Sequence, residues 1–155
     1  IIRREVDDHL RTTIQSKGQL IESLLNNYQQ MVKMLSTGSP YKDGIDEKLD
    51  KTWRLKQLER RILSTEKSYP IIKRIRVLNK NGDIIMSSDK REIGTNLSIK
   101  SIFQERKNKL YTSNIHKSKS TGEPVISIST PIFVRNKFSG LLIVNFSMED
   151  LYKLF

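Results

Sequence analysis

The sequence predicts an α+β domain, with two helices in the first 68 residues and a five-stranded antiparallel sheet in the rest. Three observations carry this prediction. Apolar residues recur every three or four positions as far as residue 66, the apolar period changes to two after Pro70, and short polar turns separate the later apolar runs. Antiparallel strands joined by tight turns pair with their neighbours, so a single sheet is expected. We therefore divide the chain into a helical region, 1–68, and a sheet region, 69–155.

The first predicted helix covers residues 5–36. Its apolar side chains follow alternating steps of three and four, with Lys17 as the one break, and they are Leu10, Ile14, Ile21, Leu24, Tyr28, Met31 and Leu35. Gly38 suits the left-handed residue that ends a helix, and Pro40 cannot continue one. Because so narrow a seam is typical of helices that pair with another helix, we predict a homodimer through this segment.

The second predicted helix covers residues 45–66. Asp43 is its expected N-cap, and its expected apolar face consists of Ile45, Leu49, Trp53, Ile62 and Leu63. The predicted strands are 71–79, 83–88, 110–116, 124–133 and 138–147, with a short helix at 99–109 between the second and the third. Asn81-Gly82 between apolar runs predicts a type I′ hairpin turn, and Asn136-Lys137 and the segment 119–123 are expected to form further turns.

The composition of the chain limits the classes of function that it can have. The chain has 155 residues, no cysteine and a formal net charge of +11, of which +8 lies in residues 69–155. Such a charge suits an acidic partner, and a basic nucleic-acid-binding domain is one open alternative, although no recognition helix or aromatic RNA-binding signature is visible. A structural dimerisation stalk without a ligand is another. No apolar run is long enough to cross a bilayer, and both ends of the sequence fit a loop between two membrane helices.

The sequence contains almost none of the residue patterns that are typical of catalytic sites. His9 and His116 have no second ligand at a spacing that binds metal, and there is no nucleophile elbow, phosphate-binding loop or dinucleotide-binding turn. Paired carboxylates such as Asp7-Asp8 stand at helix ends, where solvation explains them. We therefore expect a domain that is not an enzyme and that holds no cofactor and no metal.

Three segments carry a resemblance to a known family. They are "VLNKNGDIIMSSDKREIGTNLS" (77–98), "GEPVISISTPIF" (122–133) and "FSGLLIVNFSMEDL" (138–151). Together they resemble the PAS-like Cache, or PDC, sensor modules that lie between two membrane helices in histidine kinases, chemoreceptors and diguanylate cyclases. The resemblance implies a single PAS-like module, covered by the long helix on one face and by loops with a ligand pocket on the other. It also implies an extracytoplasmic position at the cell membrane.

The residues of this implied pocket can be named from the strand period. Arg74 and Arg76 share one face of their strand, opposite Ile75 and Val77; Ser127 and Ser129 share one face of theirs, opposite the isoleucines. We predict a ligand site formed by Arg74, Arg76, Ser87, Tyr111, Ser127, Ser129 and Asn145. Guanidinium groups bind carboxylates through paired hydrogen bonds, so the expected ligand is a small polar or anionic metabolite. The arginine, tryptophan and tyrosine set of amino-acid-binding members is absent. The alternative is that these residues face water on a half-exposed sheet.

Overall fold

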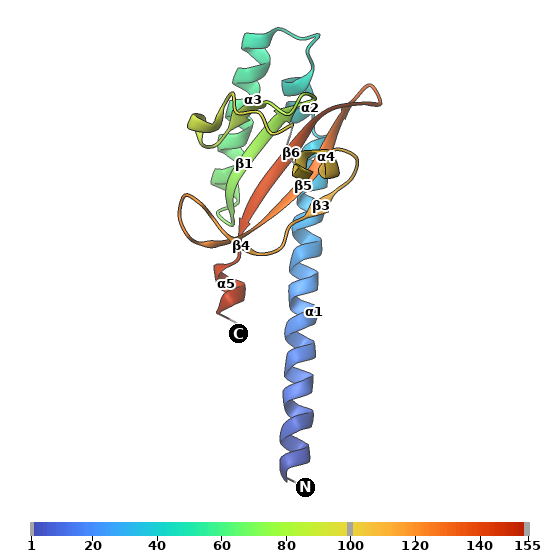
Figure 1. The fold of residues 1–155 in the computed structure, drawn as a ribbon, viewed down its shortest axis with the longest axis vertical. Coiled ribbons are helices and arrows are strands. Elements are labelled where there is room, and N and C mark those ends of the chain that lie inside the picture. The colour runs from blue at the N-terminus through green and yellow to red at the C-terminus, as the bar shows by residue number, and fades with distance from the viewer. Residues whose placement is uncertain (1, 99–100, 154–155) are drawn as a thin grey trace.

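The structure, a computed structural model, describes residues 2–98 and 101–153. Its helices are α1 (Ile2–Thr37), α2 (Ser39–Ile45), α3 (Lys51–Ser68), the 3₁₀ turn η1 (Lys90–Glu92), α4 (Ser101–Arg106) and α5 (Glu149–Tyr152). Its strands are β1 (Ile72–Asn79), β2 (Ile84–Ser87), β3 (Tyr111–Thr112), β4 (His116–Lys117), β5 (Pro124–Val134) and β6 (Lys137–Ser147). Figure 1 shows the long α1 running past a single sheet, with α5 and the first half of α1 on the same side of the sheet and the start of α1 farther out.

The strands form one antiparallel sheet in the order β2-β1-β6-β5-β3, and β4 also pairs with β5. The predicted α+β fold with an antiparallel sheet is confirmed. The expected strand 110–116 is instead two short pieces, β3 and β4, so the sheet has six strands rather than five. The expected helix 99–109 is the shorter α4, and residues 99 and 100 lie outside the described residues.

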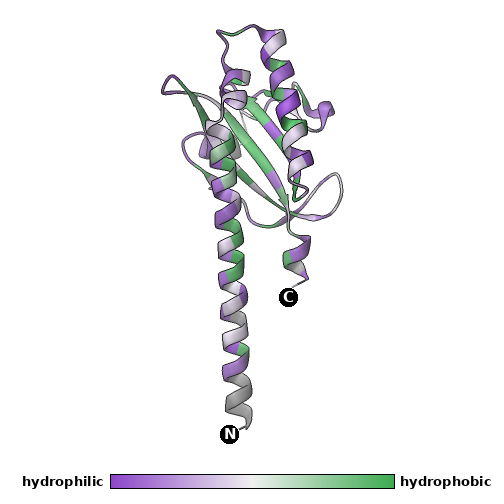
Figure 2. Ribbon diagram, turned by 180° about the vertical axis from the view of Figure 1, so that it is seen from behind, coloured by the Kyte–Doolittle hydropathy of each residue, from purple (hydrophilic) through white to green (hydrophobic). Residues whose placement is uncertain are grey.

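The main core lies between the helices and one face of the sheet (Figure 2). Ile75, Val77, Ile128, Leu142 and Val144 are almost fully buried there. They alternate along their strands with residues that point to the opposite face. From α1, the core receives the side chains of Ile21, Leu24, Leu25, Tyr28, Met31 and Leu35, which include much of the predicted seam. The Tyr28 ring stacks on Phe146 with 4.5 Å between the ring centres.

The predicted second helix differs from the observed ones. The chain forms the short α2 first, and α3 then starts after Asp50, whose carboxylate accepts a hydrogen bond from the backbone N–H of Trp53. Asp43 therefore lies inside α2 and is not the N-cap. Of the predicted apolar face, Ile45 and Ile62 are buried, whereas Leu49, Trp53 (47% exposed) and Leu63 are exposed. Leu58 and Thr65, which the prediction left out, join Ile62 on the buried face of α3.

The end of α1 also differs from the prediction. Gly38 has φ −72° and serves as the N-cap of α2, so the helix does not end in the left-handed residue that the sequence predicted. Pro40 fits the first turn of α2, where its missing N–H is not needed.

The two hairpin turns differ from the prediction: the two-residue loop with two positive φ angles is found between β5 and β6, not between β1 and β2. Between β1 and β2 only Gly82 has a positive φ (86°), so the turn is not of type I′. Asn79 instead closes this turn, since its side-chain oxygen accepts hydrogen bonds from the backbone N–H groups of Asn81 and Asp83. Between β5 and β6, Arg135 and Asn136 both have positive φ (51° and 63°) and form the two-residue loop.

Two contacts attach this second hairpin to the helices. The Arg135 guanidinium donates two hydrogen bonds of 2.8 Å to the carboxylate of Asp46, just after α2. Arg135 holds the pKa of Asp46 at about 2, below its usual value of 3.8. Gly140, on β6, lies so close to α2 that a Cβ atom would overlap the Ile45 side chain and the carbonyl oxygen of Leu78.

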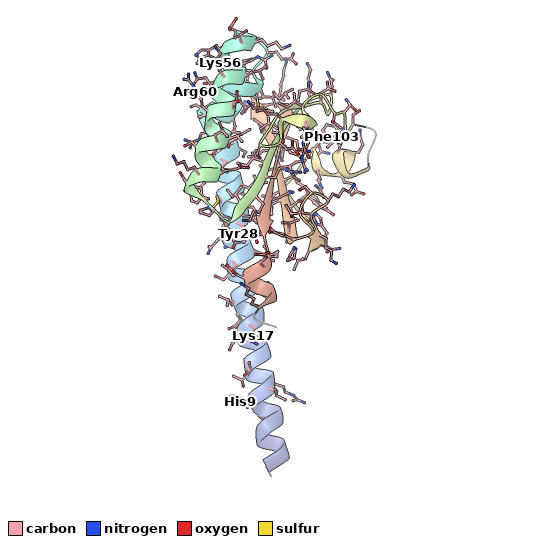
Figure 3. The ribbon with its side chains drawn as sticks, turned by 90° about the vertical axis from the view of Figure 1, so that its left-hand side faces the viewer. His9, Lys17, Tyr28, Lys56, Arg60 and Phe103 are labelled. Carbon is pink, nitrogen blue, oxygen red and sulfur yellow. The ribbon has the colours of Figure 1, made fainter. Side chains whose placement is uncertain are left out.

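The second face of the sheet is covered by η1, α4 and the loops around them, opposite the helices (Figure 3). A smaller apolar cluster lies here, with Leu78, Ile84, Phe103, Leu141 and Ile143 at its centre. In the part of the chain that the structure describes, no helix is both long and apolar enough to cross a membrane. Our division of the chain at residue 68 stays a prediction; α3 ends at that residue.

Candidate functional site

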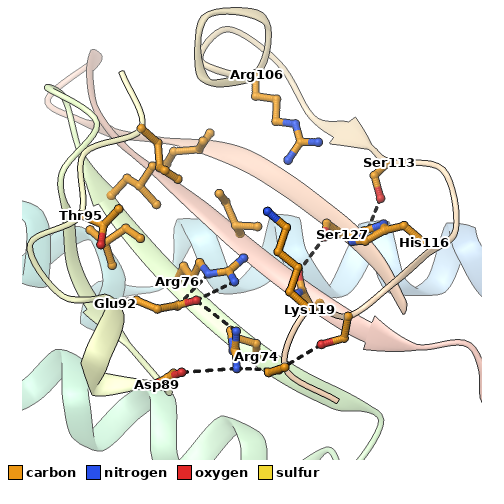
Figure 4. A pocket seen from close by; sticks show the side chains of 18 of the residues that line it. Arg74, Arg76, Asp89, Glu92, Thr95, Arg106, Ser113, His116, Lys119 and Ser127 are labelled. Atoms are coloured by element: carbon orange, nitrogen blue, oxygen red, sulfur yellow. Dashed lines mark hydrogen bonds and ion pairs between the residues drawn. The ribbon is translucent and has the colours of Figure 1, made fainter. Parts of the chain in front are cut away.

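A cavity of about 840 Å³ lies on this second face of the sheet. Side chains of β1, β5 and β6 form its floor, and its walls come from α4 and from two segments that we call the inner loop, 89–97, and the outer loop, 113–120. Its size is within the range of pockets for small ligands. Figure 4 shows the cavity with its hydrogen bonds and ion pairs.

The seven residues of the predicted site occupy two neighbouring rows across the cavity face. The first row runs from Ser87 through Arg76, Ile143 and Ser129 to Tyr111, and the second from Arg74 through Asn145 to Ser127. Residues in register on neighbouring strands point to the same face. Arg74, Arg76, Ser127 and Asn145 line the cavity directly. Ser87, Ser129 and Tyr111 do not line it, and Ser87 and Tyr111 lie on strands at opposite edges of the sheet. The structure thus brings four of the seven residues to the cavity, and the role of all seven toward a ligand stays a prediction.

The two arginines already have a carboxylate partner within the chain. Glu92 of the inner loop accepts hydrogen bonds from Arg76 Nε and Nη2, both at 2.8 Å, and from Arg74 Nη1 at 3.0 Å. The Ser87 hydroxyl donates a fourth bond of 2.8 Å. Burial alone would raise the pKa of Glu92, but the hydrogen bonds from Arg76 and Ser87 and the nearby positive charges hold it below its usual value.

Backbone pairing holds the inner loop against the edge of β2. The N–H of Gly94 donates to the carbonyl of Ile84 at 2.8 Å, and the N–H of Ile84 donates to Thr95 at 2.8 Å. Asp89 caps η1 by accepting from the backbone N–H of Arg91 at 3.1 Å. The Arg91 side chain also binds this carboxylate and holds the pKa of Asp89 at about 2.

Three other cations of the cavity have no carboxylate partner. Arg106 of α4 and Lys117 and Lys119 of the outer loop line it, and among the described residues none of the three forms an ion pair. The outer loop adjoins the arginine pair, since Arg74 Nη2 donates a 3.2 Å hydrogen bond to Ser120 Oγ, and Figure 4 shows Lys119 beside Arg74 and Arg76. Arg106 is only 8% exposed, and its guanidinium carbon lies 4.3 Å from the centre of the Tyr111 ring. Burial lowers the pKa of the Arg106 guanidinium from its usual value, although the group stays charged.

Small polar groups lie on the floor of the cavity and next to it. The Ser127 hydroxyl donates a 2.7 Å hydrogen bond to the side-chain oxygen of Asn145. The Ser113 hydroxyl accepts from the backbone N–H of Ser127 at 2.9 Å, which ties the outer loop to β5. Ser129 is fully buried, and neither its hydroxyl nor Arg106 Nε has a hydrogen-bond partner. Tyr111 is beside both residues, since it is in register with Ser129 and lies under Arg106.

Sequence reasoning missed the residues that matter most to the charge of the site. Arg106 could have been found from its spacing to Phe103, because positions three apart on a helix point the same way, toward the cavity. Lys117 and Lys119 gave only the general signal of a basic segment. Nothing in the local pattern marked Glu92 as the partner of Arg74 and Arg76, which precede it by 18 and 16 residues. No cluster able to hold a metal ion is found among the described residues.

Comparisons with known proteins give one matching family model and several solved structures of similar fold. The family model described as "Cache domain" matches residues 1–154. The sensor domain of the V. cholerae histidine kinase DctB is 12% identical with a TM-score of 0.81, and the match covers 99% of this chain and 60% of that one. The chain therefore spans about 60% of the length of such structures. A search of curated proteins gave no match.

Two further solved structures contain bound ligands. The ligand-binding domain of the Pseudomonas aeruginosa PAO1 amino acid chemoreceptor PctC, in complex with GABA, is 14% identical with a TM-score of 0.68, covering 90% of this chain and 60% of that one. The ligand-binding domain of the Campylobacter jejuni chemoreceptor Tlp3, in complex with 4-methylisoleucine, is 18% identical with a TM-score of 0.71, covering 92% and 58%. At these identities the likeness is one of fold.

Proposed function

The chain belongs to the Cache domain family, and we propose that it is the extracytoplasmic ligand-sensing part of a transmembrane receptor that binds a small anionic metabolite. As a sensor domain of this family it is a non-catalytic module. A kinase, cyclase or chemoreceptor output elsewhere in the full-length protein, with membrane helices on either side of this domain, is part of the proposal.

The observation that carries the proposal is the unmatched positive charge in the cavity. Five arginine and lysine side chains and two carboxylates line it, and those carboxylates bind Arg74, Arg76 and Arg91. Arg106 is left buried without an ion pair among the described residues, and a hydrogen bond with Tyr111 and the charge of Glu105 offset the burial of its guanidinium only in part, so that its pKa is still lowered. A buried charge is costly unless it is paired, so an anion that enters the cavity gains what Arg106 lacks. Arg106, which was not among the predicted site residues, is therefore our favoured charge partner of the ligand in place of Arg74 and Arg76.

The same strands connect the cavity with the helices. On β1, Arg74 and Arg76 face the cavity while Ile75 and Val77 pack in the core that α1 shares. A ligand can shift such a domain only by binding two of its states with different affinity. We propose that this difference is relayed through α1 and through β6 into α5.

We also propose that the receptor is a homodimer through α1. Leu10 and Leu20 are 54% and 46% exposed on this helix, away from the core residues that begin at Ile21. The part of the seam from Ile21 onward packs largely against the sheet, so the contact between two copies would lie mainly in the first half of α1.

A thermal-shift screen of carboxylates, phosphates and sulfonates tests the ligand proposal. An anion at a hundred times its dissociation constant stabilises the fold by about 2.7 kcal/mol, which raises Tm by roughly 5–10 °C in a domain of this size. Arg106→Gln should abolish the shift. Arg60→Gln is the matched control, since Arg60 is exposed on α3 (Figure 3) and does not line the cavity. If the best ligand is a cation, or if its shift survives Arg106→Gln, the proposal is wrong.

A further inference from the structure

The arginines of the cavity differ in their partners: Glu92 binds Arg74 and Arg76, whereas Arg106 of α4 has no ion pair among the described residues. At the inner loop, each oxygen of Glu92 accepts two hydrogen bonds: Oε1 from Arg74 and Arg76, Oε2 from Arg76 and Ser87. A carboxylate has about four acceptor positions, so Glu92 is saturated. It behaves as a built-in anion for the arginine pair.

Asp89, the other carboxylate of the cavity wall, is also occupied. Its Oδ1 accepts from the backbone N–H and from Nε of Arg91, and its Oδ2 accepts from Arg91 Nη2 at 2.9 Å and lies 3.6 Å from Arg74 Nη2. The described residues therefore bring no free carboxylate into the cavity. An ammonium group on a ligand would meet a net positive wall with no anionic acceptor.

The wall beside Arg106 is apolar. Leu78, Ile84, Leu97, Phe103, Leu141 and Ile143 all line the cavity, and they form the second apolar cluster of the domain. Phe103 lies one helical turn before Arg106 on α4, so the cation and this apolar wall are neighbours (Figure 4 shows Arg106 directed into the cavity). A ligand whose anionic group meets Arg106 would place the rest of its body against these side chains.

From these features we propose that the ligand is an anion with an apolar body and no ammonium group, such as an aliphatic or aromatic carboxylate. This inference rests on the proposed function of the cavity and names its ligand class. It differs from the amino acids bound in the neighbouring structures, because an amino acid needs an acceptor for its ammonium group.

Four probes, three of them with the same six-carbon length, separate these requirements in calorimetric titrations of the chain. Hexanoate has the anion and the tail, norleucine adds the ammonium group, hexylamine has only the cation, and acetate lacks the tail. We expect hexanoate to bind at least 10-fold more tightly than norleucine and hexylamine not to bind. Acetate should bind on the order of 100-fold more weakly than hexanoate, because each buried methylene contributes about fourfold.

Substitutions of cavity residues test whether hexanoate binds in the cavity. Arg106→Gln should abolish hexanoate binding, whereas Arg60→Gln should leave it unchanged. Leu97→Ser, on the edge of the apolar wall, should weaken hexanoate binding several-fold and leave acetate binding unchanged. If Arg106→Gln does not fold, Lys119→Gln on the exposed outer loop should weaken hexanoate binding several-fold in its place.

The outcomes distinguish this inference from the proposed function. If norleucine binds as tightly as hexanoate, or if none of the four probes binds, the inference is wrong. The proposed function then still stands if another anion from the screen binds and requires Arg106. If hexylamine alone binds, both are wrong.

Discussion

Replacing Glu92 by glutamine tests how strongly the fold depends on the cluster of Glu92, Arg74, Arg76 and Ser87. The substitution keeps the shape of the side chain but removes its charge, and it turns one acceptor atom into a donor that faces other donors. Removing one member of a buried ion pair costs about 3–5 kcal/mol. The three charged side chains are 20–23% exposed, so the lower end applies, about 3 kcal/mol.

This loss should lower Tm by roughly 6–12 °C in a chain of this length, as measured by scanning calorimetry at neutral pH. Arg91→Gln is the control. It removes a charge that is 86% exposed and bonded only to Asp89 at the rim, so Tm should change little. A drop below about 2 °C for Glu92→Gln, or a drop equal to that of the control, would show that the cluster does not stabilise the fold. The argument that Glu92 is a saturated, fixed counter-ion would then fail too.

Three further predictions concern other parts of the chain. Asp46→Asn should lower Tm at pH 7. Because the folded-state pKa of Asp46 is about 2 and its usual value is 3.8, its contribution is full above pH 4 and is lost as the pH falls toward 2. The difference in Tm between the wild type and the variant should therefore disappear as the pH falls from 4 to 2. A difference that stays constant would contradict the lowered pKa of Asp46. Gly140→Ala should cost about 3 kcal/mol or more by overpacking, whereas Gly18→Ala, with no atom within 4 Å of the new Cβ, should gain up to about 1 kcal/mol from helix propensity; equal denaturation midpoints would refute this. Leu10→Cys should give disulfide-linked dimers on oxidation of the receptor in membranes, while Met34→Cys, 73% exposed elsewhere on α1, should not; crosslinking of Met34→Cys alone would place the dimer contact elsewhere.

The two faces of the sheet could be predicted from the sequence because a strand alternates with a fixed period of two. Ile75 and Val77 fall in the core and Arg74 and Arg76 fall in the cavity, as the alternation implied. The long α1 followed in the same way from a period that depends only on neighbouring residues. These are local properties, and one sequence contains them in full.

Features that depend on contacts between distant segments could not be predicted. The break between α2 and α3 coincides with a close approach of Gly44 to Leu58, where a Cβ would lie 3.0 Å from the leucine side chain. The pairing of Glu92 with both arginines depends on how the inner loop folds back over β1. The role of Arg106 depends on its burial, and a lysine-rich and arginine-rich sequence does not show which of its cations is excluded from water.

The uneven support of α1 gives it the properties of a lever. Among the described side chains, its contacts with the core begin at Ile21, and the helix before that residue extends beyond the sheet (Figure 1). At 1.5 Å per residue this arm is roughly 28 Å long. A tilt of about 5° at the packed half would carry the free end through roughly 2.5 Å. A rearrangement around the cavity that is too small to alter the sheet visibly would thus produce a larger displacement at the end of the arm. The stiffness of the helix, rather than a large domain motion, then determines how much of this displacement reaches the end of α1.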